Sequence, residues 1–149
     1  MPPDIDTRLK KCFEKTRKFR ITDQLSMNIA LAPGERVLGV YFNREIDDYS
    51  DAFVITSLGL HIFSPALDAR FVAFDDIVDS HLHPNKNDQG RDVQYRFVEL
   101  ILKTGERIKV FVAGEYDNGC LELYNLDRFL GYVHIDRRIQ SQRKQKEQA

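Results

Sequence analysis

The sequence is poor in the residues that mark several protein classes. Its 149 residues include only two cysteines, Cys12 and Cys120, together with eight glycines and five prolines. Two isolated cysteines make no disulfide framework, and this content of glycine and proline excludes collagenous, low-complexity and wholly disordered chains. No apolar run approaches the roughly 18 residues of a membrane-spanning helix. The N-terminus lacks the basic segment, apolar segment and small-residue cleavage site of a secretory signal, so a cytoplasmic location is expected.

What is present is the composition of one ordinary globular domain, with 42% hydrophobic and 30% charged residues. The net charge of -1 hides an uneven layout, because residues 1–30 carry +3, residues 31–136 carry -8 and residues 137–149 carry +4. An acidic body repels phosphate-rich partners over most of its surface. We therefore expect no nucleic-acid partner, and membrane contact only through the basic termini.

The N-terminal segment has a helical period. Ile5, Leu9, Cys12 and Phe13 recur at helical spacing, which predicts an amphipathic helix over about residues 5–18. Its other face is basic, with the side chains Arg8, Lys10, Lys11, Lys15 and Lys18. We interpret this basic surface as the solvated face of a helix docked through its apolar stripe, with a helix that binds a membrane or an acidic partner as the alternative.

A second short helix is predicted directly after the first. Thr22 or Asp23 is a suitable N-cap, and the apolar residues Leu25, Ile29 and Leu31 follow. Pro33 and Gly34 are expected to end the helix.

From residue 36 onward the apolar period changes from about 3.6 to about 2, which indicates strands. Seven are predicted, over residues 36–42, 53–56, 60–64, 70–74, 77–83, 98–102 and 108–112. In the first of them Leu38, Val40 and Phe42 are expected to face the core, and Tyr41 the opposite side. Thr104 and Gly105 make the turn of the clearest hairpin.

Beyond residue 114 the period is helical again. Asp117 or Asn118 can cap a helix whose apolar stripe consists of Cys120, Leu123, Leu126, Leu130 and Val133. Such a helix is expected to cover an opening that the sheet cannot close itself. We divide the chain into a helical extension (1–30), a β-rich body with its capping helix (31–135) and a basic polar tail (136–149) that either extends the helix or frays.

Five sequence segments resemble those of bacterial pleckstrin-homology-like (PH-like) domains and, more distantly, those of the GRAM branch of that superfamily. They are LAPGERVLGVYF, FVITSLGLHIF, FVAFDDIVDSHLH, VELILKTGERIKVFV and LYNLDRFL, within about residues 31–133. The resemblance implies a mainly β fold, a partly open barrel of about seven antiparallel strands capped by a C-terminal helix. Relatives that bind phosphoinositides use basic residues in the loop that matches residues 43–51. Here four carboxylates surround Arg44, so no phosphoinositide is expected at that site.

No residue set points to catalysis, and we expect neither an enzyme nor a cofactor. Asp79, His81 and His83 share one face of a predicted strand, as three ligands of a metal ion could. Three polar residues at this spacing are more often the solvent-exposed face of a strand, so we assign no metal site. The neighbouring acids Asp75 and Asp76 read as turn residues, because side chains of adjacent residues diverge.

We therefore predict a non-catalytic adaptor that binds protein partners, including further copies of itself, at a sheet edge. The predicted interface comprises Arg44, Asp47, Asp48, Tyr49 and Asp51 of the acidic loop and the aromatic residues Tyr41, Phe63 and Phe111. Three alternatives are a peripheral membrane protein that binds through its basic ends, a small inhibitor or immunity-type protein and, least favoured, an enzyme.

Overall fold

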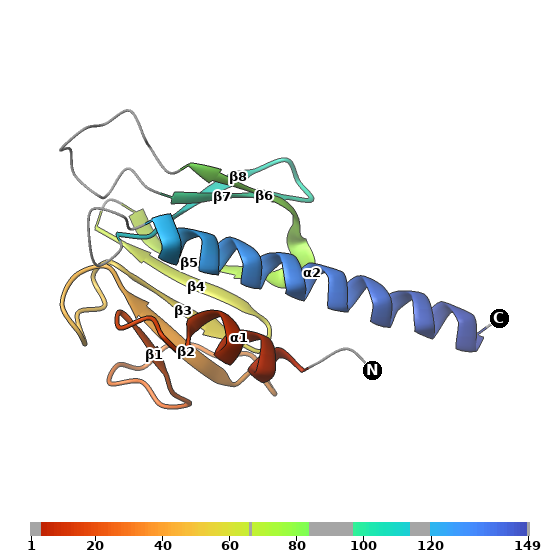
Figure 1. Cartoon of the computed structure of the whole chain (residues 1–149), viewed down its shortest axis with the longest axis horizontal. Helices are drawn as coiled ribbons and strands as arrows, with labels where there is room; N and C mark the ends of the chain where they lie inside the picture. Colours follow the sequence, from red (N-terminus) through yellow and green to blue (C-terminus); the bar gives the residue numbers. More distant parts are fainter. Residues whose placement is uncertain (1–3, 66, 84–96, 114–119, 149) are drawn as a thin grey trace.

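Two antiparallel sheets and a long C-terminal helix make up the fold (Figure 1). The computed structural model describes residues 4–65, 67–83, 97–113 and 120–148. The first sheet has the order β1-β2-β3-β4-β5 and the second the order β6-β7-β8, and among the described strands none pairs from one sheet to the other. The mainly β class with a C-terminal helix is thus confirmed, while the two sheets are not closed into a barrel.

The strands follow one another as antiparallel neighbours within each sheet. The first sheet contains β1 (Phe19–Ile21), β2 (Val37–Phe42), β3 (Ala52–Thr56), β4 (Gly59–Ser64) and β5 (Leu67–Ala73). A short 3-10 helix, η1 (Phe74–Asp76), leads into the second sheet, which contains β6 (Ile77–His83), β7 (Phe97–Leu102) and β8 (Arg107–Phe111). The strand β1 makes eight strands in the described residues, one more than predicted, because three residues are too few for an alternating pattern to be recognised.

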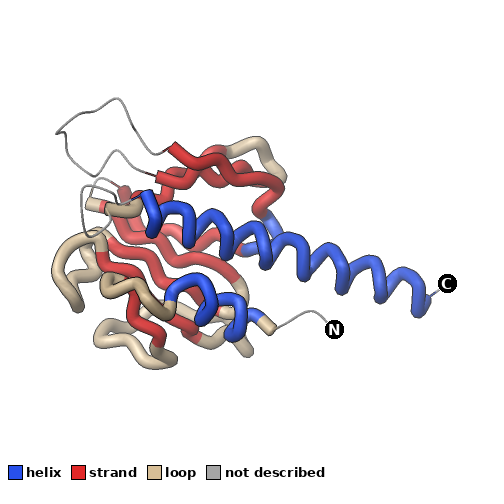
Figure 2. Tube along the Cα trace, in the orientation of Figure 1, coloured by secondary structure: helices blue, strands red, loops and turns tan. Residues whose placement is uncertain are grey.

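Two helices pack together on the sheets (Figure 2). The helix α1 (Ile5–Phe13) begins at Asp4, whose carboxylate accepts a hydrogen bond of 2.8 Å from the Thr7 amide. The helix α2 (Cys120–Gln148) contacts α1, η1, β6 and β7 and then continues past the sheets (Figure 1). The basic tail is therefore the helical end of α2. The expected capping residues Asp117 and Asn118, and the side chain of Cys120, lie outside the described residues.

One core joins both sheets to both helices. Phe129 of α2 is fully buried and contacts Phe13 of α1 and Phe74 of η1 edge to face, with ring centroids 5.9 and 6.1 Å apart. Leu9, Cys12 and Phe13 of α1 belong to this core, as the docked-helix interpretation predicts. The helix ends at Phe13 and not near residue 18, because the chain turns at Thr16 to begin β1.

The opposite face of the first sheet is covered as well. Val40, Phe42 and Val54 form a second cluster, against which Leu25 and Ile29 pack from the segment before β2. The predicted short helix after Thr22 is wrong, because residues 22–36 contain no helix and instead lie over this face of the sheet.

The prediction that Tyr41 faces away from the core is also wrong. Its side chain is 0% exposed, its ring stacks on Phe53 at 5.1 Å, and it belongs to the main core. All six residues of β2 are buried, and a register irregularity between Val37 and Gly39 shifts the alternation. An alternating pattern cannot reveal the inner face of a strand that is buried on both sides.

Two glycines give opposite expectations for substitution by alanine. A Cβ atom on Gly59 would lie 2.1 Å from the Val72 carbonyl oxygen, whereas one on Gly131 in α2 would meet nothing within 4 Å. We expect Gly59→Ala to destabilise the protein by about 1–3 kcal/mol through overpacking. Gly131→Ala is expected to stabilise it by about 0.5–1 kcal/mol, because glycine disfavours a helix interior. Urea unfolding measures both, and a neutral Gly59→Ala would contradict the close approach of β4 and β5.

Candidate functional site

The acidic loop, residues 43–51, uses its carboxylates mostly within the chain. Asp47 forms an ion pair of 2.9 Å with Arg20, and Asp51 accepts a hydrogen bond of 3.0 Å from the Asn43 side chain. Asp48 accepts hydrogen bonds from the hydroxyl and the amide of Ser50, which lower the pKa of that carboxyl. These contacts define the shape of the loop and reduce its free negative charge.

The other predicted residues of this loop differ in exposure. Arg44 is exposed, whereas Tyr49 is partly buried and packs edge to face on Phe42 at 5.2 Å. The Tyr49 hydroxyl accepts a hydrogen bond of 3.2 Å from the Ser26 amide. Asn43, at the start of the loop, bonds the carbonyl of Phe111 at 2.9 Å, which places the loop beside the end of β8.

The five basic residues predicted on the first helix also separate into two groups. The Arg8 guanidinium binds the Asp136 carboxylate in a bidentate manner, at 3.0 and 3.1 Å, and lies over the Tyr132 ring. The Lys18 ammonium donates to the Asn43 carbonyl at 3.0 Å. Lys10, Lys11 and Lys15 are exposed. Arg8 and Lys18 are thus part of the packing between elements, and three lysines remain as surface charge.

Asp79, His81 and His83, the three residues of β6 considered as metal ligands, form no metal site in the described part of the chain. Asp79 and His81 are both exposed, with 3.3 Å between the carboxylate and Nε2. The His83 side chain lies outside the described residues. No group of three histidine, cysteine or acidic side chains among the described residues is placed to hold a metal ion.

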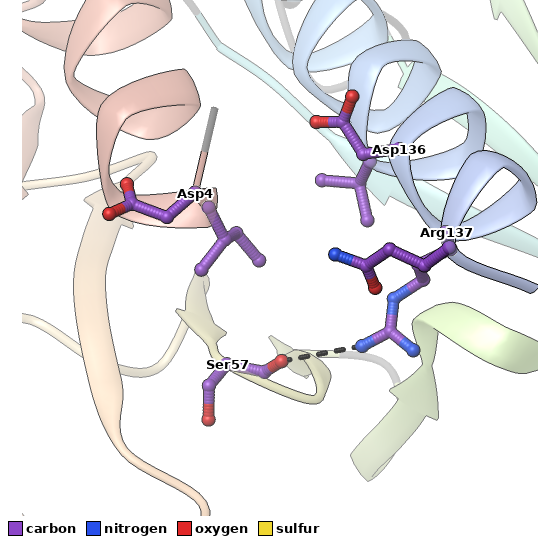
Figure 3. A pocket seen from close by; sticks show the side chains of 7 residues that line it. Asp4, Ser57, Asp136 and Arg137 are labelled. Carbon is purple, nitrogen blue, oxygen red and sulfur yellow. Dashed lines mark hydrogen bonds between the residues drawn. The ribbon is translucent and has the colours of Figure 1, made fainter. Parts of the chain in front are cut away.

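A polar hollow of about 260 Å³ lies between the start of α1, the β3–β4 turn and α2 (Figure 3). Its charged groups already have partners, because Asp136 binds Arg8 and Arg137 binds Asp75 at 2.5 Å. Arg137 also donates to the Ser57 carbonyl at 3.5 Å (Figure 3). Asp4, the third charged residue of the hollow, accepts the hydrogen bond from the Thr7 amide at the start of α1. The contacts of Asp136 and Arg137 thus join α1 and α2 to one another and to the sheet.

A buried polar cluster lies on the outer face of the first sheet. The Glu35 carboxylate accepts hydrogen bonds from the Thr56 hydroxyl at 2.5 Å, from the Ala32 amide at 2.9 Å and from His61 Nε2 at 2.9 Å. The Thr56 hydroxyl donates to the carboxylate and not to the imidazole, so the three groups lack the order of nucleophile, base and acid that a catalytic triad requires. Their arrangement is that of a satisfied structural network.

His61 also lines a hollow of about 390 Å³, which we call the outer hollow. Its lining residues are Met27, Asn28, Ile29, Ala30, His61, Phe63, Ala69, Arg70 and Phe71. The Phe71 ring is 42% exposed and lies 4.6 Å from the His61 ring, centroid to centroid. Phe63, one of the predicted anchors, thus borders a concave apolar surface.

A larger hollow of about 690 Å³, the edge groove, lies between the two sheets. It is lined by Ile62, Ser64, Asp68, Ala69, Arg70, Glu106, Arg107, Ile108, Lys109 and Phe111. These residues come from the β4–β5 hairpin and from the segment around β8, and both β5 and β8 are terminal strands of their sheets. Phe111, a second predicted anchor, borders this groove.

One ion pair connects the two sides of the edge groove. The Arg70 guanidinium of β5 binds the Glu106 carboxylate in a bidentate manner, at 2.5 and 2.6 Å, and the two side chains are 46% and 45% exposed. This pair lowers the pKa of the Glu106 carboxyl. Neither residue belongs to a motif that is recognisable in the sequence. The alternation of the two hairpins indicates only that Arg70 lies on a strand and that Glu106 lies in the turn before the next one.

Comparison of the chain with models of known protein families, with curated proteins and with solved structures finds no match. Neither described helix is both long enough and apolar enough to traverse a bilayer.

Proposed function

We propose that this chain is a non-catalytic protein-interaction module of the PH-like type, which binds an extended segment of a partner protein as an additional strand on β5. The observation that carries the proposal is the edge groove. Two terminal strands of different sheets border a mainly apolar hollow of about 690 Å³, bridged by one half-exposed ion pair. Terminal strands offer backbone donors and acceptors to an added strand, and adjoining hollows take its side chains.

The acidic loop supports the same proposal. Asn43 connects the loop to the end of β8 through two hydrogen bonds, one to the Phe111 carbonyl at 2.9 Å and one from the Ala113 amide at 2.7 Å. The loop therefore adjoins the Phe111 end of the edge groove, where Arg44 and the remaining carboxylates can contact the flanks of a bound segment. We assign the groove to the partner's strand and the loop to its flanks.

The test uses a display library of random dodecapeptides selected on the full chain. Ala69 lies in β5, borders both hollows and is absent from the residue pairs that β5 forms with β4. Proline there adds a ring to the terminal strand and removes one of its backbone donors, so we expect Ala69→Pro to weaken binding of a selected peptide at least tenfold. Ala69→Ser, at the same position, keeps the amide and is expected to bind as the wild type does.

Amide hydrogen exchange of the complex gives an independent measurement. Protection of β5 on peptide binding supports the proposal, provided that circular dichroism shows both variants to be folded. Wild-type affinity in Ala69→Pro overturns it. A dimer whose β5 amides are protected without peptide also overturns it, because the strand is then occupied by a second copy of this chain.

A second function is favoured by the cationic end of α2. Arg138, Arg143, Lys144 and Lys146 are exposed on the part of the helix that continues past the sheets (Figure 1). Clustered cations of this kind attract anionic lipid. Co-sedimentation with phosphatidylserine vesicles, combined with failure of every peptide selection, would replace the first proposal with peripheral membrane binding.

A further inference from the structure

The strand β5 lies between the two hollows, and its residues Ala69 and Arg70 line both of them. Arg70 is paired with Ile62 of β4, on the side of the main core, whereas Phe71 is paired with His61, on the side of the outer hollow. A strand added to β5 would alternate in the same way, because side chains of a strand point to opposite faces in turn. Every second residue of the bound segment would therefore face the edge groove, and the residues between would face the outer hollow.

The ion pair between Arg70 and Glu106 stands where the added strand has to lie. Its bidentate contact joins β5 to the residue that precedes β8, so a segment inserted between the two edges separates the two side chains. Breaking the pair costs little, since an ion pair as exposed as this one contributes about 0–1 kcal/mol. The Glu106 carboxylate can be solvated by water once the pair is separated.

Unlike Glu106, Arg70 cannot become solvated when the ion pair separates, because it is part of β5 and the added strand covers it. Its guanidinium stays charged, since arginine does not deprotonate in proteins. A covered charge without a partner is strongly unfavourable. Of the other charged residues that line the groove, Arg107 forms an ion pair of 2.8 Å with Glu99, which leaves Lys109 and Asp68. Separation from Glu106 leaves Arg70 without its partner, so we expect a carboxylate of the bound segment to take that place.

We infer that the partner is an extended peptide with an aspartate or glutamate opposite Arg70 and apolar residues beside it, and that this carboxylate replaces Glu106 as the partner of Arg70. The apolar residues next to the acid face Phe71 and Phe63 in the outer hollow, and those two positions away face Ile62 and Ile108 in the groove. Alternating hollows and a cross-strand ion pair together define this specificity. The inference rests on the proposed function and adds the chemistry of the partner.

The experiment uses dodecapeptides selected on the full chain and synthetic copies in which the acid is replaced by its amide. We expect the selected peptides to share one acidic position flanked by apolar residues, and the amide copy to bind at least tenfold more weakly. Glu106→Gln removes the competing carboxylate and is expected to strengthen binding of the acidic peptide at least threefold. Arg70→Gln is expected to bind the acidic and the amide peptides equally.

Asp75→Asn is the matched control, because it breaks an exposed aspartate–arginine pair, at 2.5 Å from Arg137, that does not line the groove. It is expected to leave both affinities unchanged. Equal binding of acidic and amide peptides to the wild type, with protection of β5, would overturn the inference and leave the proposed function standing. Failure of all peptides to protect β5 would overturn the proposed function itself.

Discussion

Replacing Phe129 by alanine is expected to lower the free energy of unfolding by about 3–5 kcal/mol, the range for deletion of a large buried aromatic side chain. Phe129 is 0% exposed and contacts Phe13 and Phe74 edge to face. Its removal opens a cavity where α1, α2 and the link between the two sheets meet. The cavity cannot collapse without moving a helix, which places the expected loss toward the upper part of the range.

Urea unfolding followed by far-ultraviolet circular dichroism measures this loss. Tyr124→Ala is the matched control, because Tyr124 is an aromatic residue of the same helix with 47% exposure. We expect the control to change stability by less than about 0.5 kcal/mol. A loss below about 1 kcal/mol for Phe129→Ala would show that α2 does not pack on α1 and η1 in solution.

The period of the apolar residues predicts the mainly β class and the positions of most strands and of both helices. The hairpin of β7 and β8 has the predicted turn, with Gly105 at a φ of 87°, and β6 spans the predicted residues 77–83. These strands have one solvent-exposed face, so the alternation of apolar and polar residues identifies them directly. The helical period likewise located α1 and α2, although it did not locate the end of α1.

The errors arise where a second layer covers the sheet. The prediction for Tyr41 is wrong because it assumes that only one face of β2 is buried, whereas Leu25 and Ile29 cover the other face. The same covering explains why Leu25 and Ile29, whose spacing indicated a helix, are bound to the sheet surface without forming one. Local spacing carries no information about a segment whose apolar residues are satisfied by tertiary contacts.

The site was less predictable than the fold because its residues are far apart in the sequence. Arg70 lies in β5 and Glu106 in the turn before β8, 36 residues away, and Glu35 and His61 are separated by 26 residues. The sequence does indicate that edge strands exist, and the predicted interface lies at a sheet edge. Which two edges face each other depends on how the two sheets pack, and no local pattern encodes that. Strand alternation alone predicts Phe63 and Phe111 as interface residues, and each lines one of the two hollows.

Glu35 is the second residue whose replacement is expected to have a large effect. Burial, the largest single influence, raises the pKa of its carboxyl, but the hydrogen bonds from Thr56, Ala32 and His61 together hold the pKa below the ordinary value of 4.5. Glu35→Ala removes the common acceptor of three donors and leaves buried polar groups unpaired. We expect a loss of about 3–4 kcal/mol at pH 7, since hydrogen bonds to a charged acceptor contribute more than neutral ones.

The effect of Glu35→Ala is expected to depend on pH in a defined direction. A carboxyl whose pKa is lower in the folded than in the unfolded state stabilises the fold fully above the unfolded value, and loses that contribution as the pH falls through the folded value. The difference in unfolding free energy between wild type and Glu35→Ala should therefore be constant near neutral pH and become smaller below about pH 4.5. Glu45→Ala, in the exposed part of the acidic loop, is the control and should show a small difference at every pH.

The comparison of two variants is needed because Asp4, Asp6, Asp48 and Glu106 also have lowered pKa values and make the wild type less stable in acid. Their contributions are common to the wild type and to Glu35→Ala, so they cancel in the difference between the two. A difference that stays constant from pH 7 to pH 3 would mean that Glu35 is not held as an ionised acceptor. The segment of residues 22–36 would then be fixed on the sheet without an ionised Glu35, through the apolar contacts of Leu25 and Ile29 and through hydrogen bonds such as that from the Ser26 amide to Tyr49.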